Sequence, residues 1–253
     1  MRTTFIQTNL QWENPSANRK MFSEKFTALI GKTDLVVIPE MFTTGFSMRS
    51  KELAETMEGP TVAWLKDEAK KIGAVITGSM IIRNEDQFFN RLLWVTPTGE
   101  VIFYDKKHLF TLAGEHGHFT PGTERVIIEY MGWKICPLIC YDLRFPEWAR
   151  NKENYDLLIY VASWPDRRRA AWQALLKARA IENQCYTIGV NRIGEDGSKL
   201  NYAGDSTLID FAGKSLINAK NIDGSFNAKI SLTERREFIG KLPFLNDQDD
   251  FIG

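Results

Sequence analysis

The sequence predicts a layered α/β protein in which helices cover a core of two β-sheets. Short runs rich in Val, Ile and Leu alternate along the chain with amphipathic helical patterns. Helical patterns lie both early and late, with many strand patterns between them, as layered folds require. The 253 residues are 43% hydrophobic and 25% charged, which is typical of a globular protein. Because no repeat, low-complexity tract or linker interrupts the pattern, we expect one domain over residues 1–253.

The first predicted elements alternate between strand and helix. Thr3–Gln7 is expected to be a strand, and Asn18–Ile30 a helix, because its apolar side chains recur on one face. Asp34–Glu40 is an apolar run that ends in an acid, which predicts a buried strand. Thr61–Ile72 is expected to be a second helix, since a Gly-Pro pair precedes it and a Gly follows it.

The rest of the chain is predicted to consist of strands and one long helix. Turn sequences at Pro97-Thr98-Gly99, Met131-Gly132 and Ala212-Gly213 each separate two strand patterns and predict hairpins. The helix is expected at Arg167–Asn183, a run rich in Ala and Leu. The predicted strands are Ala74–Ser79, Arg91–Thr96, Val101–Asp105, Arg125–Tyr130, Lys134–Cys140, Leu157–Ala162, Cys185–Val190, Ser206–Phe211, Ser215–Asn218 and Phe226–Ser231.

Charge and cysteine content argue against several classes of protein. The 32 basic and 32 acidic residues cancel, which disfavours a nucleic-acid or anionic-membrane partner. Three cysteines, an odd number, do not fit a disulfide-stapled secreted protein. The first residues lack the apolar run of a signal peptide, and no apolar stretch approaches the about 18 residues that span a bilayer. We therefore expect a cytoplasmic protein.

Two charged residues follow strand patterns that otherwise look buried. Glu40 lies between apolar residues, where desolvation raises the pKa of a carboxylate unless a cation compensates. A carboxylate with a raised pKa can act as a general base near neutral pH. Lys107 lies in the aromatic-rich segment that follows the strand Val101–Asp105. The alternatives are a solvated acid at a strand end and an ordinary surface lysine.

Cys140 differs from the other two cysteines in its position. An apolar strand leads directly into it, a polar turn follows, and Pro146 suits the first turn of a helix. At such a junction, backbone N–H groups can lower the thiol pKa and bind an oxyanion. The alternative is a buried cysteine acting as a small hydrophobic residue, which fits Cys136 and Cys185.

Three segments, in order, resemble the Glu, Lys and Cys signatures of the nitrilase or carbon–nitrogen hydrolase superfamily: VVIPEMF (36–42), YDKKHLF (104–110) and LICYDLRFPE (138–147). VASWP (161–165), WQALLKARAIENQCY (172–186) and AGDSTLIDFAG (203–213) extend the resemblance over essentially the whole chain. The resemblance implies a four-layer α-β-β-α sandwich, assembled into homodimers or larger homo-oligomers. It also implies a second glutamate after the lysine, which we assign to Glu115.

The resemblance implies a cysteine-dependent amidase that needs no cofactor. Glu40 would take the thiol proton as Cys140 attacks the amide carbon of a small molecule. The Lys107 ammonium and the backbone N–H of Tyr141 would hold the oxyanion, and Glu115 would orient Lys107 or the substrate. Ammonia would leave behind a thioester, which water activated by Glu40 would then hydrolyse.

The segments CYDLRFPEW, VASWP and LLKARAIENQ most resemble the omega-amidase branch, which removes the terminal amide of α-keto acids such as 2-oxoglutaramate or 2-oxosuccinamate. Such a substrate carries a carboxylate, which Arg144 or a neighbouring arginine could pair with. Alternatively, Arg144 forms a structural ion pair with Glu147 or Asp142. The side chains expected to line the pocket are Phe42, Phe46, Tyr141 and Trp164.

Other constellations compete with this interpretation. His108, His116 and His118 could form a metal cluster with Glu115, but they lie in a Gly-rich loop that does not fix ligand geometry, so we predict no metal. A papain-like pair of Cys140 with a histidine would leave the Glu and Lys segments unexplained. Within the family, hydrolysis of a nitrile, an N-carbamoyl compound or another amide remains open, as does a non-catalytic binding protein of the same fold.

Overall fold

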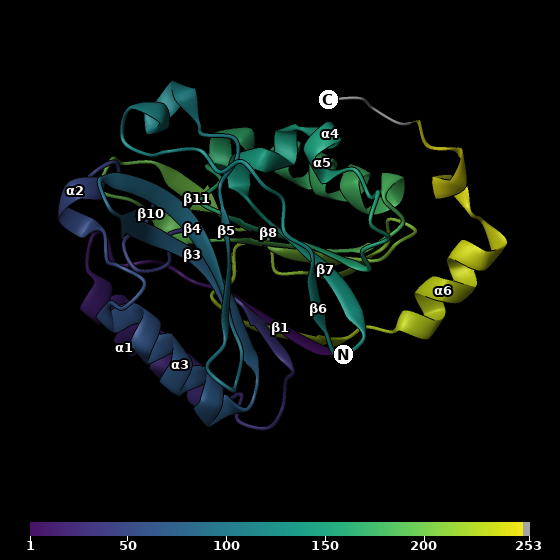
Figure 1. Ribbon diagram of the computed structural model, residues 1–253, viewed down its shortest axis with the longest axis horizontal. Coiled ribbons are helices and arrows are strands. Elements are labelled where there is room, and N and C mark those ends of the chain that lie inside the picture. Colours follow the sequence, from purple (N-terminus) through teal and green to yellow (C-terminus); the bar gives the residue numbers. More distant parts are fainter. Residues whose placement is uncertain (250–253) are drawn as a thin grey trace.

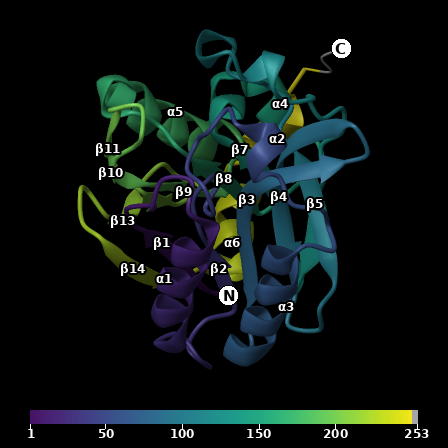
Figure 2. The same ribbon diagram turned by 90° about the vertical axis from the view of Figure 1, so that its left-hand side faces the viewer.

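Two six-stranded sheets lie face to face in the computed structural model, which describes residues 1–249 (Figure 1). The end of the predicted domain, residues 250–253, lies outside the described residues. Helices α1 (Pro15–Thr27) and α3 (Pro60–Ile72) lie side by side on the outer face of one sheet (Figure 2). Helices α4 (Pro146–Ala149) and α5 (Arg169–Glu182) lie on the outer face of the other. The predicted four-layer α-β-β-α sandwich is therefore confirmed.

The first sheet is a mixed sheet built mainly from the N-terminal half of the chain. Its order is β14-β1-β2-β3-β4-β5; β1, β2 and β3 are parallel, and the other neighbours are antiparallel. The strands are β1 (Arg2–Gln7), β2 (Leu35–Val37), β3 (Val75–Asn84), β4 (Gln87–Val95), β5 (Val101–Asp105) and β14 (Gly224–Lys229).

The second sheet comes from the C-terminal half and has the order β13-β12-β9-β8-β7-β6, with β7, β8 and β9 parallel. Two short strands, β10 and β11, pair separately. The strands are β6 (Ile128–Tyr130), β7 (Trp133–Ile139), β8 (Leu157–Ala162), β9 (Tyr186–Asn191), β10 (Ile193–Glu195), β11 (Asn201–Ala203), β12 (Thr207–Ile209) and β13 (Ser215–Asn218).

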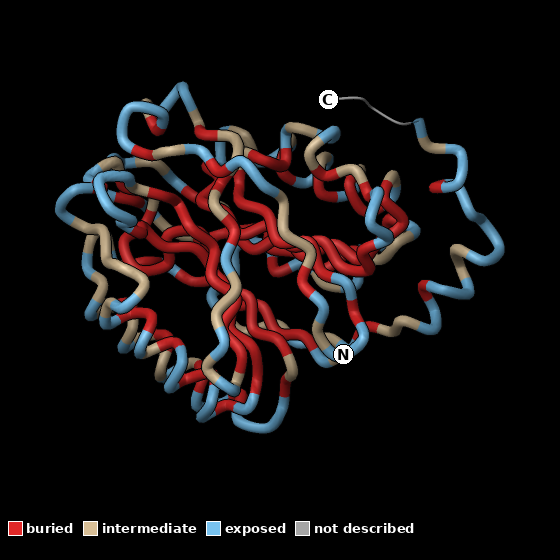
Figure 3. Tube along the Cα trace, in the orientation of Figure 1, coloured by how far each residue is buried: buried red, intermediate tan, exposed pale blue. Residues whose placement is uncertain are grey.

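The strands of both sheets carry mostly buried residues (Figure 3), and their apolar side chains hold the layers together. Phe22 and Phe26 of α1 pack with Val62 and Leu65 of α3 against the outer face of the first sheet. Between the sheets and under α5, a larger cluster includes Trp94, Trp133, Trp172 and Leu176. Burying one such aromatic side chain stabilises the fold by about 1.5–3 kcal/mol, so these clusters fix the relative position of the strand ends.

Several predicted boundaries differ from those observed, each for a local reason. The strand predicted at Asp34–Glu40 contains only Leu35–Val37, since Pro39 has no N–H to donate and Met41 has a φ of 43°. Helix α1 begins earlier than predicted, at Pro15, because the Asn14 side chain accepts the N–H of Ala17.

Helices α2 (Ser50–Leu53) and α6 (Leu232–Lys241) and several 3₁₀ turns, η5 (Phe244–Asp247) among them, were not predicted. Helix α6 is mostly polar, so it carries little periodicity, although the Ser231 side chain caps it at Glu234. The short helix α2 and the 3₁₀ turn η5 are equally weak patterns. None of the described helices is both long and apolar enough to cross a membrane.

Candidate active site

The ends of strands from both sheets meet around one buried cluster of polar side chains. Glu40 follows β2, Lys106 follows β5 and Cys140 follows β7, while Ser163 follows β8. Glu115 comes from the 3₁₀ turn η2 (Glu115–Gly117), which lies beyond a loop after β5. Glu40, Lys106 and Glu115 are fully buried, and Cys140 is 9% exposed. Two sheets that share one core thus bring residues from distant parts of the chain together.

Cys140 occupies a strained turn between β7 and the 3₁₀ helix η3 (Cys140–Arg144). Its φ is 43°, in the left-handed region, where a residue with a side chain costs about 1–3 kcal/mol. The buried Asp142 carboxylate holds the turn by accepting the N–H of Ile139 at 3.0 Å. Pro146 begins helix α4, as predicted. The predicted junction of strand, cysteine and helix is therefore present, and Cys140 lines a pocket.

The thiol of Cys140 is not activated in the resting protein. Burial raises its pKa well above the ordinary value, and the nearby Glu40 carboxylate raises it further, while Lys106 and the Ser163 N–H act in the opposite direction. A backbone N–H, that of Ser163, does lower this pKa, but burial outweighs it, so the thiol pKa is raised and not lowered as expected. A neutral thiol must lose its proton during attack, and Glu40 is placed to accept it.

Lys106 is the cation at the centre of the cluster. Its ammonium nitrogen lies 3.0 Å from Glu40 Oε1 and 2.9 Å from each carboxylate oxygen of Glu115. Burial by itself would lower the pKa of Lys106, but the carboxylates of Glu115 and Glu40 outweigh burial and raise it. The Lys106 ammonium therefore stays charged and compensates the two buried carboxylates.

The second oxygen of each carboxylate is also hydrogen-bonded. The backbone N–H of Ser163 donates to Glu40 Oε2 at 2.7 Å, and that of Phe110 donates to Glu115 Oε2 at 2.5 Å. Glu40 is thereby fixed with one oxygen toward Lys106 and the other toward the β8 end. The pKa of Glu115 is raised overall. Burial is the main cause and the Glu40 carboxylate adds to it, while the Lys106 ammonium acts in the opposite direction.

The expectation that Lys107 lies in this cluster is wrong by one residue. Successive side chains of a strand point to opposite faces, so Lys106 continues the inward face of the buried Tyr104. Lys107 is half-buried elsewhere, with its ammonium 5.3 Å from the Trp148 ring centroid. The period of two residues links Lys106 to Tyr104 in the sequence, but only the structure shows that Tyr104 is the buried one.

A cavity of about 270 Å³ opens beside Cys140 and Lys106. Phe46, Tyr141 and Trp164 line it, as predicted, and the Phe46 ring centroid lies 5.1 Å from the Lys106 ammonium. The expectation for Phe42 is wrong. Its ring is fully buried between the first sheet and its helices, against Phe22 at 5.8 Å and Trp64 at 6.1 Å, because the chain turns after Glu40.

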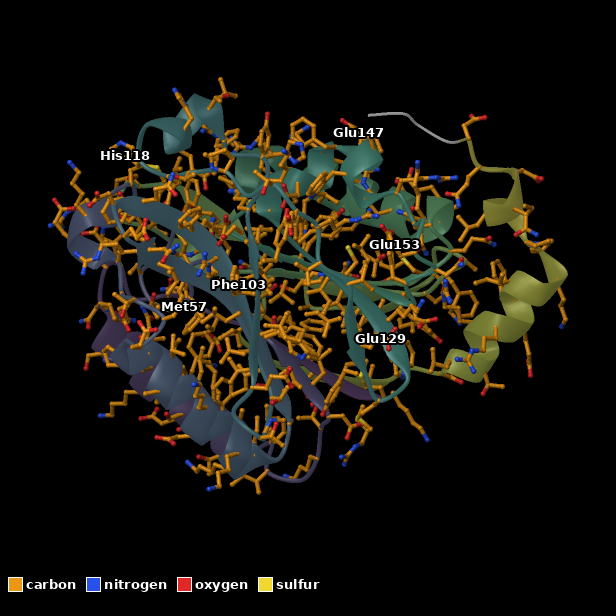
Figure 4. All side chains as sticks on the ribbon, in the orientation of Figure 1. Met57, Phe103, His118, Glu129, Glu147 and Glu153 are labelled. Atoms are coloured by element: carbon orange, nitrogen blue, oxygen red, sulfur yellow. The ribbon has the colours of Figure 1, made fainter. Side chains whose placement is uncertain are left out.

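Three arginines border the cavity: Arg144, Arg167 and Arg168. The Arg144 guanidinium lies 5.0 Å from the Trp164 ring centroid, and that of Arg168 lies 4.9 Å from the Phe110 ring centroid. Within residues 1–249, none of the three forms an ion pair with a carboxylate. The alternative of an Arg144 ion pair with Glu147 or Asp142 is therefore wrong, and Figure 4 shows Glu147 on α4. The cavity is positively charged at its rim.

The histidines do not form a cluster. His108 stacks on Phe145, and its Nδ1 lies 2.8 Å from Asp142. His116 and His118 are exposed, and Figure 4 shows His118 at the edge of the molecule. No group of three His, Cys, Asp or Glu side chains in the described part of the chain could hold a metal ion.

The sequence is similar to those of known carbon-nitrogen hydrolases. A family model for carbon-nitrogen hydrolases matches residues 5–237. The omega-amidase YafV of Escherichia coli (strain K12) is 43% identical over 252 residues, covering 99% of this chain and 98% of that protein. The 2-oxoglutaramate amidase of Bacillus subtilis (strain 168) is 36% identical over 248 residues, covering 96% and 95%.

Comparison with solved structures gives the same family. The crystal structure of XC1258 from Xanthomonas campestris, a CN-hydrolase superfamily protein with an arsenic adduct in its active site, superposes with a TM-score of 0.98 at 42% identity. The superposition covers 100% of this chain and 98% of that one. Sequence and three-dimensional similarity therefore extend together over the entire chain.

Replacing Lys106 by Met should destabilise the protein by about 3–5 kcal/mol at neutral pH, because Glu40 and Glu115 would be buried without a cation. The loss should shrink as pH falls, since unpaired buried carboxylates have raised pKa values and become neutral on protonation. Urea unfolding from pH 8 to pH 5 measures both effects. In the control, Lys107→Met should cost no more than about 1 kcal/mol at any pH; equal losses in both variants would contradict the assignment.

Proposed function

The chain belongs to the carbon-nitrogen hydrolase family, and on that premise we propose that it is an omega-amidase. It would convert 2-oxoglutaramate, or the shorter 2-oxosuccinamate, to the 2-oxo dicarboxylate and ammonia. The observation that carries the proposal is a buried thiol, ammonium and carboxylate beside a small cavity rimmed by unpaired arginines. The names of the relatives from Escherichia coli and Bacillus subtilis support the same substrate class.

In the first half of the reaction, the thiol of Cys140 attacks the amide carbon while its proton moves to Glu40. The oxyanion of the tetrahedral intermediate is stabilised by the Lys106 ammonium and by the backbone N–H of Tyr141, the residue after the nucleophile. One such donor accelerates acyl transfer by about 10²–10³-fold. Glu40 then donates its proton to the departing nitrogen, the C–N bond breaks, and ammonia leaves a thioester on Cys140.

In the second half, water replaces ammonia and the same groups act in reverse. Glu40 removes a proton from the water as its oxygen attacks the thioester carbon, and Lys106 again faces the oxyanion. The C–S bond breaks, Cys140 recovers a proton, and the product leaves as a carboxylate. Glu115 acts through Lys106, whose ammonium it holds with both of its oxygens.

The arginines explain why the substrate is an acid rather than a neutral amide. Burial lowers the pKa of Arg168, and the charges of Arg167 and Arg144 lower it further. Three guanidinium groups without carboxylate partners gain stabilisation when an anion enters. We assign the carboxylate of the substrate to Arg144, with Arg168 beside it, while Trp164, Tyr141 and Phe46 contact the carbon chain.

Three further properties belong to the same proposal. We propose a homodimer or larger homo-oligomer, since the exposed apolar side chains of Ile181, Leu242 and Phe244 lie near Gln184, which bonds to the Leu242 carbonyl. We also propose one domain over residues 1–253 and a cytoplasmic location, where the free thiols of all three cysteines stay reduced.

Each of these properties has its own test. A monomeric mass in sedimentation would contradict the oligomer, and two stable proteolytic fragments would contradict the single domain. Recovery of the protein outside the cytoplasm would contradict the location.

Replacing Cys140 by Ser should reduce ammonia release from 2-oxoglutaramate by at least about 10³-fold, because the nucleophile is lost. Mass spectrometry of the acid-quenched native protein should find an acyl group on the peptide that contains Cys140. Cys185→Ala is the matched control, since Cys185 is fully buried and its thiol contacts Thr187. Full activity of Cys140→Ser, or an acyl group on another peptide, would refute the mechanism.

Replacing Arg144 by Gln should lower kcat/KM for 2-oxoglutaramate by about 10–100-fold, the effect of losing one hydrogen bond between charged groups. For butyramide, which has no carboxylate, the same variant should change kcat/KM little. Arg83→Gln serves as the control, because Arg83 is exposed at the end of β3. An equal loss on both substrates would remove Arg144 from the role of carboxylate ligand.

A further inference from the structure

We propose that Asn90 is a positioning residue that keeps Glu40 in its proton-accepting form by sharing one neutral amide group between Glu40 and Glu115. The proposal rests on the proposed function, because it concerns the base that serves Cys140. Asn90 lies in β4, opposite Ile81 of β3, and is fully buried. No sequence motif marks Asn90 as a functional residue, since it simply precedes an arginine and an apolar run.

Asn90 contacts three residues of the cluster: Glu40, Glu115 and Lys106. Its side-chain nitrogen lies 2.8 Å from Glu40 Oε1 and 3.4 Å from Glu115 Oε1. Its backbone carbonyl accepts the N–H of Lys106 at 3.0 Å, which extends the pairing of β4 and β5 by one residue. One residue thus fixes the backbone of the cation and both carboxylates that the cation binds.

The hydrogen bonds form a closed ring of four atoms. Glu40 Oε1 and Glu115 Oε1 each accept from both the Lys106 ammonium and the Asn90 amide nitrogen. Two carboxylates that face one ammonium carry an excess negative charge in a buried site. Hydrogen bonds to the charged form of an acid favour that form, so the amide adds stabilisation without adding a charge.

The orientation of the amide is set by the carboxylates. Asn90 Oδ1 is buried and has no hydrogen-bond partner in the described part of the chain. An unpaired buried carbonyl oxygen is destabilising, but the two hydrogen bonds from the NH₂ group to Glu40 and Glu115 offset this. Exchanging the two atoms would place an oxygen lone pair against two carboxylates.

The titratable groups around Glu40 come from several elements: Lys106 after β5, Glu115 in η2, Cys140 in η3 and Tyr202 in β11. Of these, only Lys106 is a cation, and it is shared with Glu115. Without the Asn90 donor, the negative charges of Glu40 and Glu115 would be less compensated, which favours uptake of a proton by the pair. Glu40 would then be protonated, and unable to accept the thiol proton, over a wider pH range.

The test measures two pH profiles in the full-length protein: kcat/KM for 2-oxoglutaramate, and the rate of Cys140 alkylation by iodoacetamide, followed by peptide mass spectrometry. Asn90→Leu removes the donor at similar size, and Asn90→Asp removes it and adds a carboxylate. Thr77→Val is the matched control, because the Thr77 hydroxyl is buried in the same sheet without a hydrogen-bond partner in the described part of the chain.

In Asn90→Leu, the acid limb of each profile should move to higher pH by about 1–2 units, the effect of losing one hydrogen bond to a carboxylate. In Asn90→Asp the limb should move at least as far, because the added carboxylate also repels Glu40 and Glu115. Activity should fall about 10–100-fold at neutral pH and recover toward the native value at alkaline pH. Thr77→Val should leave both limbs in place. If Asn90→Leu does not fold, Asn90→Ala decides the question, because it removes the donor without adding a charge.

Lower activity at every pH with an unmoved acid limb would overturn the proposal, because a packing defect alone has that effect. The alkylation profile separates this failure from failure of the proposed function. If the native protein hydrolyses no keto-acid amide but the alkylation limb still moves in the Asn90 variants, the role of Asn90 stands and the substrate is wrong. If hydrolysis occurs and neither limb moves, the role of Asn90 is wrong and the proposed function stands.

Discussion

One buried ammonium determines how the rest of the site is arranged. Lys106 is almost completely buried, and its ammonium nitrogen lies 2.9–3.0 Å from the carboxylate oxygens of Glu40 and Glu115. Neither carboxylate could remain charged in this position without the cation, and the cation could not remain charged without the carboxylates. The three side chains must therefore be buried side by side. The ends of β2 and β5 and the η2 turn place them there.

The buried Asp142 carboxylate links this cluster to the nucleophile. It accepts hydrogen bonds from Ile139, just before Cys140, and from the His108 backbone, two residues after Lys106. The Tyr104 hydroxyl donates to the same carboxylate at 2.8 Å. The strained Cys140 turn of one sheet and the lysine segment of the other are thus tied through one group, so the distance between sulfur and ammonium is fixed before substrate enters.

The two sides of the cavity contribute different properties. The inner side holds charges that compensate one another, so it is preorganised for a reaction in which an oxyanion forms and disappears. The outer rim, with Arg144, Arg167 and Arg168, has positive charge that nothing in residues 1–249 compensates. An anionic group of the substrate can supply the missing charge there, which leaves its amide end facing Cys140. The separation of charge along the cavity thereby orients the substrate.

The sequence by itself predicted the layered fold, the positions of most strands, and Glu40, Cys140 and Glu115 as members of one site, because these depend on local periodicity and on short motifs. It also indicated the pocket residues Phe46, Tyr141, Trp164 and Arg144. Only the tertiary structure decided between Lys106 and Lys107, which adjoin in the chain but point to opposite sides of a strand.

Three other features likewise required the folded molecule. Phe42 packs under the helices rather than in the cavity, because the chain turns after Glu40. The thiol pKa of Cys140 is raised and not lowered, because burial outweighs the nearby donors. Asn90 enters the cluster because β4 begins at Gln87, before the strand predicted at Arg91–Thr96, and its side-chain amide faces Glu40 and Glu115. Direction of a side chain, burial and contact between distant strands arise from packing in three dimensions, and local sequence does not carry that information.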